Sequence, residues 1–271
     1  MRRLGWQPGR VMSEILEWIE VLAVAGLLAY LVMSFVTVRM HVPTGSMIPS
    51  IDPRDSFFVD RISYYFREPI PGDIVVFWHT DAVLVKAVSD DASASGDIEP
   101  GLRVTTINRE PTYSAQAIDD AIAGLADGTR IYLGLEGAAS VEIGVKTAAV
   151  DSIEDLGIRL RERRIRYVKR LIATAGQTVQ IRNGDVFVDG VRLDGDRFDR
   201  HYSSTDPRMD YGIGPTVVPE GHWFVLGDNS NNSWDSRYWG FVDKRDFIGE
   251  PYFRVWPLDR FGAMNGYFGS S

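Results

Sequence analysis

The sequence predicts a mainly β protein behind one N-terminal transmembrane helix, with an α+β module inserted into the β domain. Three observations lead to this fold class. Residues 21–38 carry no charge, and short alternating apolar segments bounded by Gly, Pro, Asp or Asn dominate after residue 40. A strand-helix-strand pattern interrupts them between residues 80 and 165. With 271 residues, the chain is long enough for two units that each have a core.

Composition excludes several classes of protein and site. A net charge of -8 makes nucleic acid an unsuitable partner for the chain as a whole. The absence of cysteine excludes disulfides and thiolate metal sites, and fits an exported location. The four histidines are scattered, and no group of His, Asp and Glu has the spacing of metal ligands. We therefore expect no metal and no cofactor.

The apolar run VLAVAGLLAYLVMSFVTV, residues 21–38, predicts a membrane anchor. As a helix its eighteen residues would span about 27 Å, close to the thickness of a bilayer's hydrocarbon core. Arg2, Arg3 and Arg10 precede it, which predicts a cytoplasmic N-terminus and an external chain after Arg39. A cleaved signal peptide is the alternative, but its apolar core would be shorter and followed by a small-residue cleavage site. We expect a retained single-pass anchor.

The remaining chain divides into β segments and an insert. The expected strands are DSFFVDRI, GDIVVFW, RIRYVKRLIA, TVQIRNGDVFVDG, HWFVLGD and FIGEPYFRVW. Asn183-Gly184 predicts a type I′ hairpin turn within the fourth of these. In the insert, SAQAIDDAIAGLADG has helical apolar spacing from Ala117 to Leu125, with Ser114 as N-cap and Gly128 beyond the end. We predict an anchor domain at 1–40, a β domain at 41–79 plus 166–271, and the insert at 80–165.

Two segments supply candidates for covalent catalysis. Ser46 lies in PTGSMIP, but a serine hydroxyl needs a base, and His41 is the nearest histidine in sequence. In the expected strand RYVKRLIA, alternation puts Tyr167, Lys169 and Leu171 on one face. Lys169 is either an edge lysine that extends to solvent or a buried amine with a lowered pKa. A neutral lysine could take the proton of Ser46.

A third segment, GDNSNNSWDSRYWGFV, follows the strand HWFVL. It could be an ordinary polar loop, but it combines an arginine with several large aromatic residues, which a loop exposed to solvent does not need. Pairing of Asp228 or Asp235 with Arg170 or Arg237 would fix it beside the strand of Lys169. A hydroxyl such as that of Ser233 could then orient the lysine amine.

Together the three segments resemble type I signal peptidases, the membrane-anchored serine proteases that remove signal peptides. PTGSMIPSI resembles the Ser-Met segment of that family, RYVKRLIATAG its lysine segment, and GDNSNNSWDSRYWGFV its third motif, with PGDIVVFW as the strand between the first two. The resemblance covers residues 15–79 and 166 to about 260. The chain departs from the family at Ala173–Gln177 and at Ser230-Asn231, where Arg-Asp is common.

The resemblance implies roles for individual residues. Ser46 would be the nucleophile, Lys169 the general base and Ser233 the group that positions Lys169. Thr44 Oγ1 and the Ser46 backbone N–H would form the oxyanion hole. Shallow pockets for small substrate side chains would be lined by Val42, Met47, Ile51, Tyr167 and Val168. Asp228, Asp235, Arg170 and Arg237 would form the supporting charge network.

The resemblance also implies partners and location. The partners would be preprotein signal peptides with small residues before the cut, the lipid bilayer and the protein-export machinery. The location would be the bacterial inner (plasma) membrane, with the catalytic domain outside the cytoplasm. Rival hypotheses are a processing peptidase dedicated to one substrate, a catalytically inert scaffold, and a self-cleaving repressor-type protein.

The insert resembles a PDZ domain in its order of strands and helices. The carboxylate-binding loop of that fold should come first and does not, but DLGIRL at 155–160 could supply it in a circularly permuted domain. The insert would then bind partner peptides. The alternative is a degenerate module that only packs on the catalytic domain.

Overall fold

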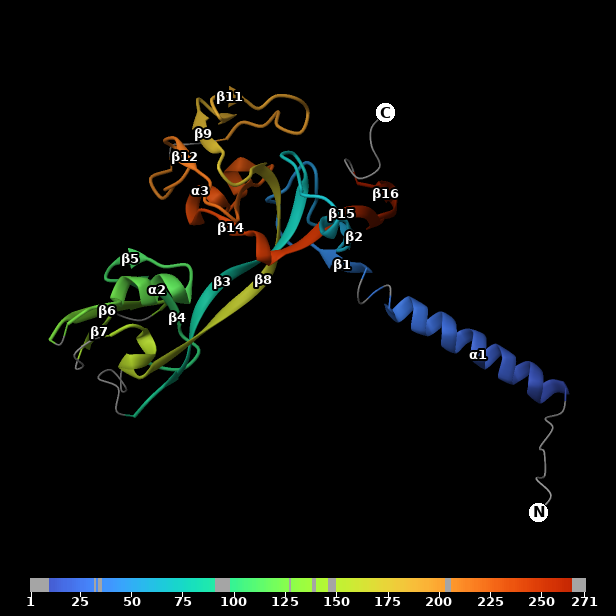
Figure 1. The fold of residues 1–271 in the computed structure, drawn as a ribbon, viewed down its shortest axis with the longest axis horizontal. Helices are drawn as coiled ribbons and strands as arrows, with labels where there is room; N and C mark the ends of the chain where they lie inside the picture. The colour runs from blue at the N-terminus through green and yellow to red at the C-terminus, as the bar shows by residue number, and fades with distance from the viewer. Residues whose placement is uncertain are drawn as a thin grey trace, which may run out of the picture. The chain divides into compact units, whose positions relative to one another are not determined.

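The computed structural model describes residues 10–31, 33, 36–90, 98–126, 128–137, 140–145, 150–202 and 206–264. The chain forms two compact units (Figure 1). The first unit comprises Met1–Val76 and Val168–Ser271, and the second comprises Phe77–Tyr167. The chain passes into the second unit within strand β3 (Ile74–Val88) and returns within strand β8 (Ile158–Ala173). The predicted mainly β fold is confirmed.

Helix α1 (Arg10–Leu31) contains the first part of the predicted membrane span. The span does not continue as a helix to Val38, because β-branched residues at its end join strand β1 (Thr37–His41), which pairs with β2 (Ser56–Asp60). Within the described ranges, none of the helices combines the length and the apolar character needed to cross a bilayer. Residues 1–9, with Arg2 and Arg3, lie outside the described residues.

In the first unit, antiparallel strands surround the segments predicted to carry chemistry. Strand β2 lies between β1 and β15 (Phe247–Trp256), and β15 also pairs with β3 and with β16 (Gly262–Ala263). Strand β13 (His222–Leu226) pairs with the end of β8 and with β14 (Val242–Asp243). Buried residues from these strands and from the loop after β1 form one core cluster: Met40, Val42, Met47, Ile51, Phe57, Val59, Val76, Val168 and Met264.

A separate four-stranded sheet in the first unit confirms the predicted hairpin. Its order is β11 (Val191–Arg192), β10 (Asp185–Val188), β9 (Thr178–Arg182) and β12 (Thr216–Val217). At the turn between β9 and β10, Asn183 and Gly184 have φ angles of 53° and 90°. Both are positive, as a type I′ turn requires. A Cβ at Gly184 would also lie 2.0 Å from the His201 ring, so this position requires glycine.

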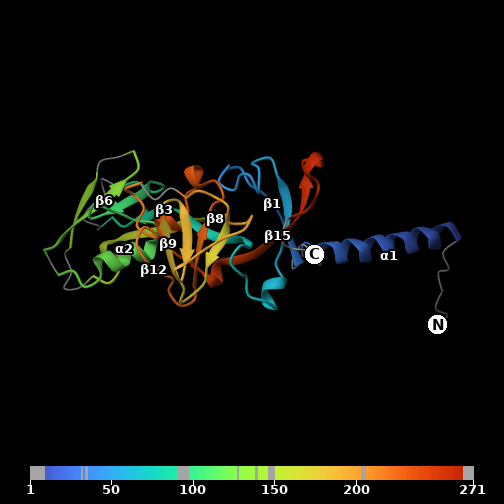
Figure 2. The same cartoon turned by 90° about the horizontal axis from the view of Figure 1, so that it is seen from above.

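The second unit has its own core beside a sheet in the order β3, β4 (Arg103–Ile107), β6 (Arg130–Leu135) and β7 (Val141–Gly144). The short strand β5 (Glu110–Pro111) pairs with β4. Helix α2 (Ala115–Ile122) lies beside the strands of this unit (Figure 2). It buries Ile118 and Ile122 in the core. Short helical segments also occur at η2 (Ser63–Tyr65), η3 (Ile153–Leu156), η4 (Ser230–Asn232), α3 (Ser236–Trp239), η5 (Lys244–Asp246) and η6 (Leu258–Arg260).

The start of α2 was predicted correctly and its end was not. Ser114 is the N-cap, and its side chain accepts a hydrogen bond from the Ala117 N–H at 3.0 Å. The helix stops at Ile122, because Ala123 has an extended ψ of 132°. Leu125, expected in the helix, instead forms a β-bridge with Val150. Tertiary pairing has therefore overridden the helical apolar spacing at the last turn.

Candidate active site

Ser46 and Lys169 are 123 positions apart in the sequence and meet in the first unit. The Lys169 Nζ lies 2.9 Å from the Ser46 Oγ, and the two atoms are hydrogen-bonded. Ser46 stands in the loop after β1, and Lys169 stands near the end of β8. The residues are 6% and 3% exposed. The amine and the hydroxyl are thus in contact and largely shielded from water.

The surroundings of Lys169 favour its neutral form. Burial lowers the pKa of Lys169 to about 8, because the ammonium loses its hydration. The Asp235 carboxylate acts in the opposite direction and raises this pKa, whereas the Arg237 guanidinium lowers it. About a tenth of the molecules then carry a neutral amine at pH 7, against well under a thousandth for an ordinary lysine. A neutral amine can accept a proton from the hydroxyl beside it.

The loop that carries Ser46 is held by the segment after β13. The Asn229 backbone N–H donates to the Ser46 carbonyl at 3.0 Å, and the Asn229 side-chain amide donates to the Gly45 carbonyl at 2.9 Å. A Cβ on Gly227 would lie 2.6 Å from the Ser46 carbonyl oxygen, so this close approach requires glycine. On the same loop, Thr44 Oγ1 lies 3.4 Å from Ser46 Oγ.

Two buried ion pairs fix the third segment. Arg170 contacts Asp228 through Nε and Oδ1 at 2.7 Å and through Nη2 and Oδ2 at 2.5 Å. Arg237 contacts Asp235 in the same two-pronged way, at 2.8 Å and 3.0 Å. All four side chains are at most 5% exposed. Because Lys169 and Arg170 are neighbours on a strand, they point to opposite faces, and the first pair holds the strand from the side away from the amine.

Asp235 and Arg237 also organise the backbone of this segment. Asp235 is the N-cap of α3 and accepts from the Gly227 N–H at 3.0 Å. Arg237 donates to the Ser230 hydroxyl at 2.9 Å and to the Ser230 carbonyl at 2.8 Å. Ser230, where the resemblance had led us to expect arginine, therefore serves as an acceptor for a buried guanidinium. The buried side chains of Asp235 and Arg237 therefore satisfy each other and the groups of Ser230.

The other predicted residues are placed as follows. Four apolar residues expected to line substrate pockets are 0–5% exposed in the core cluster of the first unit, and they are Val42, Met47, Ile51 and Val168. Tyr167 belongs to the second unit, where its ring centroid lies 4.6 Å from that of His79. Ser233 Oγ is buried and has no hydrogen-bond partner among the described residues, so the expected hydrogen bond to Lys169 is not formed there.

The His41 ring, on β1, contacts the Asp55 carbonyl at 3.1 Å, and the residue is exposed. Among the described residues, no cluster of three or more His, Cys, Asp and Glu could hold a metal ion. The titratable group that the geometry brings to the Ser46 hydroxyl is the buried amine of Lys169.

Sequence reasoning missed Asn229 and Ser50. Asn229 lies inside the third motif, GDNSNNSWDSRYWGFV. Its position directly after Gly-Asp could have indicated that it hydrogen-bonds to a neighbouring loop. Ser50 had no such signal, because its partner Asp228 is 178 positions away. Its hydroxyl also accepts from Arg170 Nη2 at 3.1 Å. Ser50 thus links the loop of the candidate nucleophile to the Arg170–Asp228 pair.

Comparison with known proteins identifies a family model and several relatives that are described as signal peptidases. A family model described as signal peptidase, peptidase S26, matches residues 15–256. The chain is 26% identical to signal peptidase I of Leptolyngbya laminosa, over 93% of this chain and 85% of that protein. It is 28% identical to the probable signal peptidase I-1 of Synechocystis sp., over 93% and 88%. It is 39% identical to signal peptidase I P of Bacillus subtilis subsp. natto, over 36% and 56%.

Replacement of Lys169 by Met should stabilise the fold at neutral pH. Below pH 8 the folded protein holds a buried ammonium, and the lowering of its pKa from 10.5 to about 8 costs on the order of 3 kcal/mol. Between these two pH values the unfolded chain binds a proton that the folded chain lacks, so wild-type stability rises with pH. The gain from Lys169→Met should therefore shrink from pH 8 to 10.5 and vanish above it.

Urea unfolding of both proteins between pH 6 and pH 10.5 measures this difference. Lys244→Met is the matched control, because Lys244 is an exposed lysine paired with Glu68. Its effect on the free energy of unfolding should show no step in this window. A difference between wild type and Lys169→Met that stays constant with pH would contradict the lowered pKa.

Proposed function

The chain belongs to the signal peptidase family, peptidase S26, and we propose that Ser46 and Lys169 perform its chemistry. The protein is a type I signal peptidase, a serine peptidase that removes signal peptides. The observation that supports the proposed dyad is the 2.9 Å contact between a buried amine and a buried hydroxyl. No other base is needed to activate the serine.

In the proposed mechanism, neutral Lys169 takes the proton of Ser46 Oγ as this oxygen attacks the scissile carbonyl carbon. The resulting ammonium then gives the proton to the departing amine, which leaves an acyl-enzyme. Water attacks the acyl-enzyme, with Lys169 again accepting a proton. Because the amine is held by burial at a pKa of about 8, it can exchange protons in both directions near neutral pH.

The negative charge that develops on the carbonyl oxygen needs donors. We assign this role to the Ser46 backbone N–H and the Thr44 hydroxyl, which lies 3.4 Å from Ser46 Oγ. The buried cluster of Val42, Met47, Ile51 and Val168 supports this loop from below. A closely packed surface of this kind cannot move aside for a large group, so it would favour small substrate side chains next to the cleaved bond.

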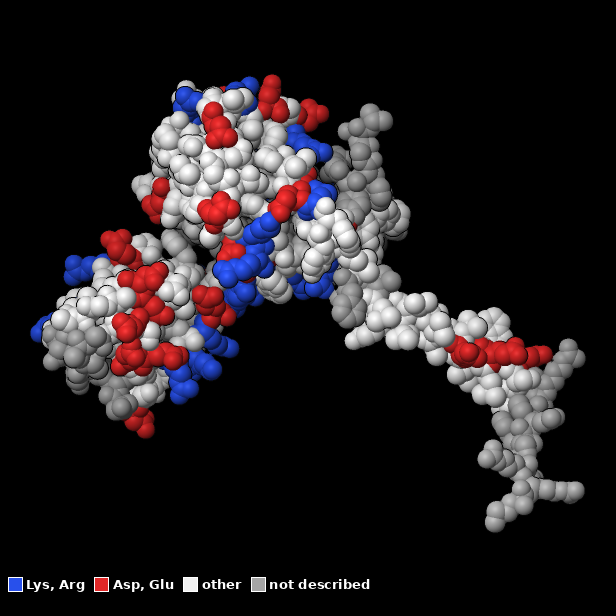
Figure 3. Space-filling model, viewed as in Figure 1, with Lys and Arg blue, Asp and Glu red and all other residues white. Residues whose placement is uncertain are grey.

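We further propose that α1 anchors the enzyme to a lipid bilayer. From Val21 to Leu31 the helix carries no charge, and large apolar side chains such as Leu22 and Leu28 are 66% and 57% exposed. Figure 3 shows acidic side chains gathered toward the start of this helix and none along the rest. Anchoring at the bacterial plasma membrane, with the catalytic unit outside, would bring the enzyme to preproteins delivered by the export machinery.

For the second unit we propose a PDZ-like module that binds peptides. Two features support the proposal: α2 has a defined N-cap, and its first N–H, on Ala115, donates to Glu162 of β8 at 2.8 Å. The start of β8 follows Gly157, whose φ of 78° makes a tight turn before an exposed strand. An exposed strand beside a helix is a common arrangement for adding a peptide as a further strand.

Ser46→Ala and Lys169→Ala should each abolish cleavage of a preprotein. Each variant removes one half of the proposed proton transfer, so activity should fall at least about a thousandfold. Cleavage is followed by gel shift of the preprotein, and circular dichroism checks the fold. Lys244→Ala, at an exposed lysine, should retain wild-type activity. A folded Ser46→Ala or Lys169→Ala enzyme that loses much less than about a thousandfold of its activity would refute the assigned role.

Thr44→Val should lower kcat by about a hundredfold to a thousandfold and leave KM nearly unchanged, because the hydroxyl would contact the transition state and not the bound substrate. The matched control is Thr44→Ser, which keeps the hydroxyl and should retain most activity. Steady-state kinetics on a signal-peptide substrate measure both variants. Equal losses in Thr44→Val and Thr44→Ser would point to packing in place of oxyanion stabilisation.

Deletion of residues 82–164, with a short turn in their place, should spare cleavage of a minimal peptide. The strands β3 and β8 pair within the first unit, where Leu171 N–H donates to the Asp73 carbonyl at 2.8 Å, so the base of this hairpin should form without its tip. Comparison of the kinetics on the peptide with those on a full preprotein separates substrate binding by the second unit from catalysis by the first. Loss of peptide cleavage in a folded deletion variant would show that the second unit belongs to the catalytic body.

A further inference from the structure

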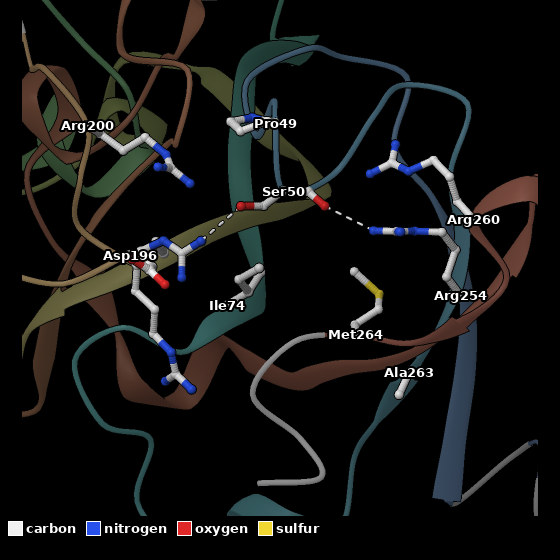
Figure 4. Close-up of a pocket in the computed structure, with 11 residues that line it drawn as sticks. Pro49, Ser50, Ile74, Asp196, Arg200, Arg254, Arg260, Ala263 and Met264 are labelled. Atoms are coloured by element: carbon white, nitrogen blue, oxygen red, sulfur yellow. Dashed lines mark hydrogen bonds between the residues drawn. The ribbon is translucent and has the colours of Figure 1, made fainter. Parts of the chain in front are cut away.

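A cavity of about 280 Å³ in the first unit is lined by eleven residues, five of which are arginines (Figure 4). The arginines come from three separated parts of the chain: Arg170 from β8, Arg197 and Arg200 from the segment after β11, and Arg254 and Arg260 from β15 and η6. The only acidic residue among those lining it is Asp196. Such a gathering of cations is unusual in a chain whose net charge is -8.

Neighbouring carboxylates use only part of the hydrogen-bonding capacity of these arginines. Arg200 donates from Nη1 to the Asp199 carbonyl at 2.7 Å, while its Nε is buried without a partner among the described residues. Arg197 has Asp73 at 3.6 Å, too far for a hydrogen bond. Each guanidinium has five N–H donors, so donors remain for a ligand. In Figure 4, Arg200 faces Arg254 and Arg260 across the space beside Ser50.

The two arginines on the far side of Ser50 are close enough for the charge of Arg260 to lower the pKa of Arg254. Burial lowers the pKa of Arg254, Asp55 raises it, and the charge of Arg260 lowers it further. Arg254 donates from Nη2 to the Ser50 carbonyl at 3.0 Å, and its Nε lies 2.9 Å from Asp55 Oδ2. Arg260 Nη1 lies 3.2 Å from Asp55 Oδ1, so the two guanidinium groups share one carboxylate. An anion in the cavity would offset the repulsion between these guanidinium groups.

We propose that this arginine cavity binds a phosphate group, supplied either by a phospholipid head group or by free phosphate. A carboxylate has two oxygens and is served by one two-pronged arginine, as the Arg170–Asp228 pair illustrates. Guanidinium groups that converge from opposite walls instead suit a tetrahedral anion with several oxygens. The lipid source is included because Trp256, Leu258 and Phe261, on the same segment as Arg254 and Arg260, are 52%, 71% and 58% exposed.

An occupant of the cavity would lie behind the loop of Ser46. Ser50 accepts from Arg170 through its hydroxyl and from Arg254 through its carbonyl, so it connects the cavity wall to that loop. A bound phosphate should therefore stabilise the folded protein. The inference does not depend on the proposed dyad, because neither Ser46 nor Lys169 is among the residues that line the cavity.

The test uses the full chain in a maltoside detergent, which contains no phosphate. Isothermal titration with inorganic phosphate, and separately with soluble dihexanoyl-phosphatidylglycerol, measures Kd against chloride at equal ionic strength. Arg200→Gln and Arg260→Gln should each weaken binding by about tenfold or more, because each removes charge-assisted donors. Arg192→Gln is the matched control, since Arg192 is an exposed arginine on β11 paired with Asp185, and it should bind as wild type does.

The outcomes distinguish the ligand sources and the two proposals. Binding of the lipid at least tenfold tighter than phosphate assigns the site to a head group, and equal binding assigns it to the phosphate itself. Heat no greater than that with chloride for either ligand, or binding that survives in both cavity variants, would overturn the proposal. Ser46→Ala should bind phosphate as wild type does while it fails to cleave, so loss of one function leaves the other interpretable.

Discussion

The contact between the Lys169 amine and the Ser46 hydroxyl is the constraint on which the rest of the first unit depends. A lysine that is 3% exposed destabilises the fold whenever it carries its proton, so its neighbours must hold it against solvent. These neighbours are the apolar core cluster of the first unit and the loop after β1, which hydrogen bonds from Asn229 hold in place. Neither alone would suffice: the cluster supplies the low polarity that lowers the pKa, and the loop supplies the 2.9 Å alignment.

Strand alternation explains why the charges near the Lys169 amine do not cancel the lowering of its pKa by burial. Lys169 and Arg170 point to opposite faces of β8, so the guanidinium that ties the strand to Asp228 is directed away from the amine whose pKa burial lowers. Arg237 and Asp235 are paired with each other, and their effects on the pKa of Lys169 are opposite: Asp235 raises it and Arg237 lowers it. Arginine stays charged and can thus form the supporting ion pairs. Lysine can lose its proton and is therefore the residue suited to the proposed proton transfer.

The sequence was sufficient for the parts of the fold that have local signals. Alternation predicted the strands, Asn183-Gly184 predicted its turn, and Ser114 predicted the start of α2. It was not sufficient where distant segments decide the outcome. The end of α2 depends on a bridge to Val150, and the end of the apolar N-terminal run depends on the pairing of β1 with β2. The roles of Ser50 and Asn229 depend on partners that local patterns cannot identify, and the five cavity arginines come from three segments that only the folded chain brings together.

The same separation of segments explains how the chain accommodates a second unit between the serine and the lysine. β3 and β8 are hydrogen-bonded at both ends: Gly72 N–H donates to the Leu171 carbonyl in the first unit, and Ser89 N–H donates to the Gly157 carbonyl in the second, each at 2.8 Å. Residues added at the tip of a hairpin do not change the register at its base, because each ladder bond is fixed by its neighbours along the strand. The register at the base is what positions Lys169. The geometry around Ser46 and Lys169 can therefore stay constant while the tip acquires a core and a helix of its own.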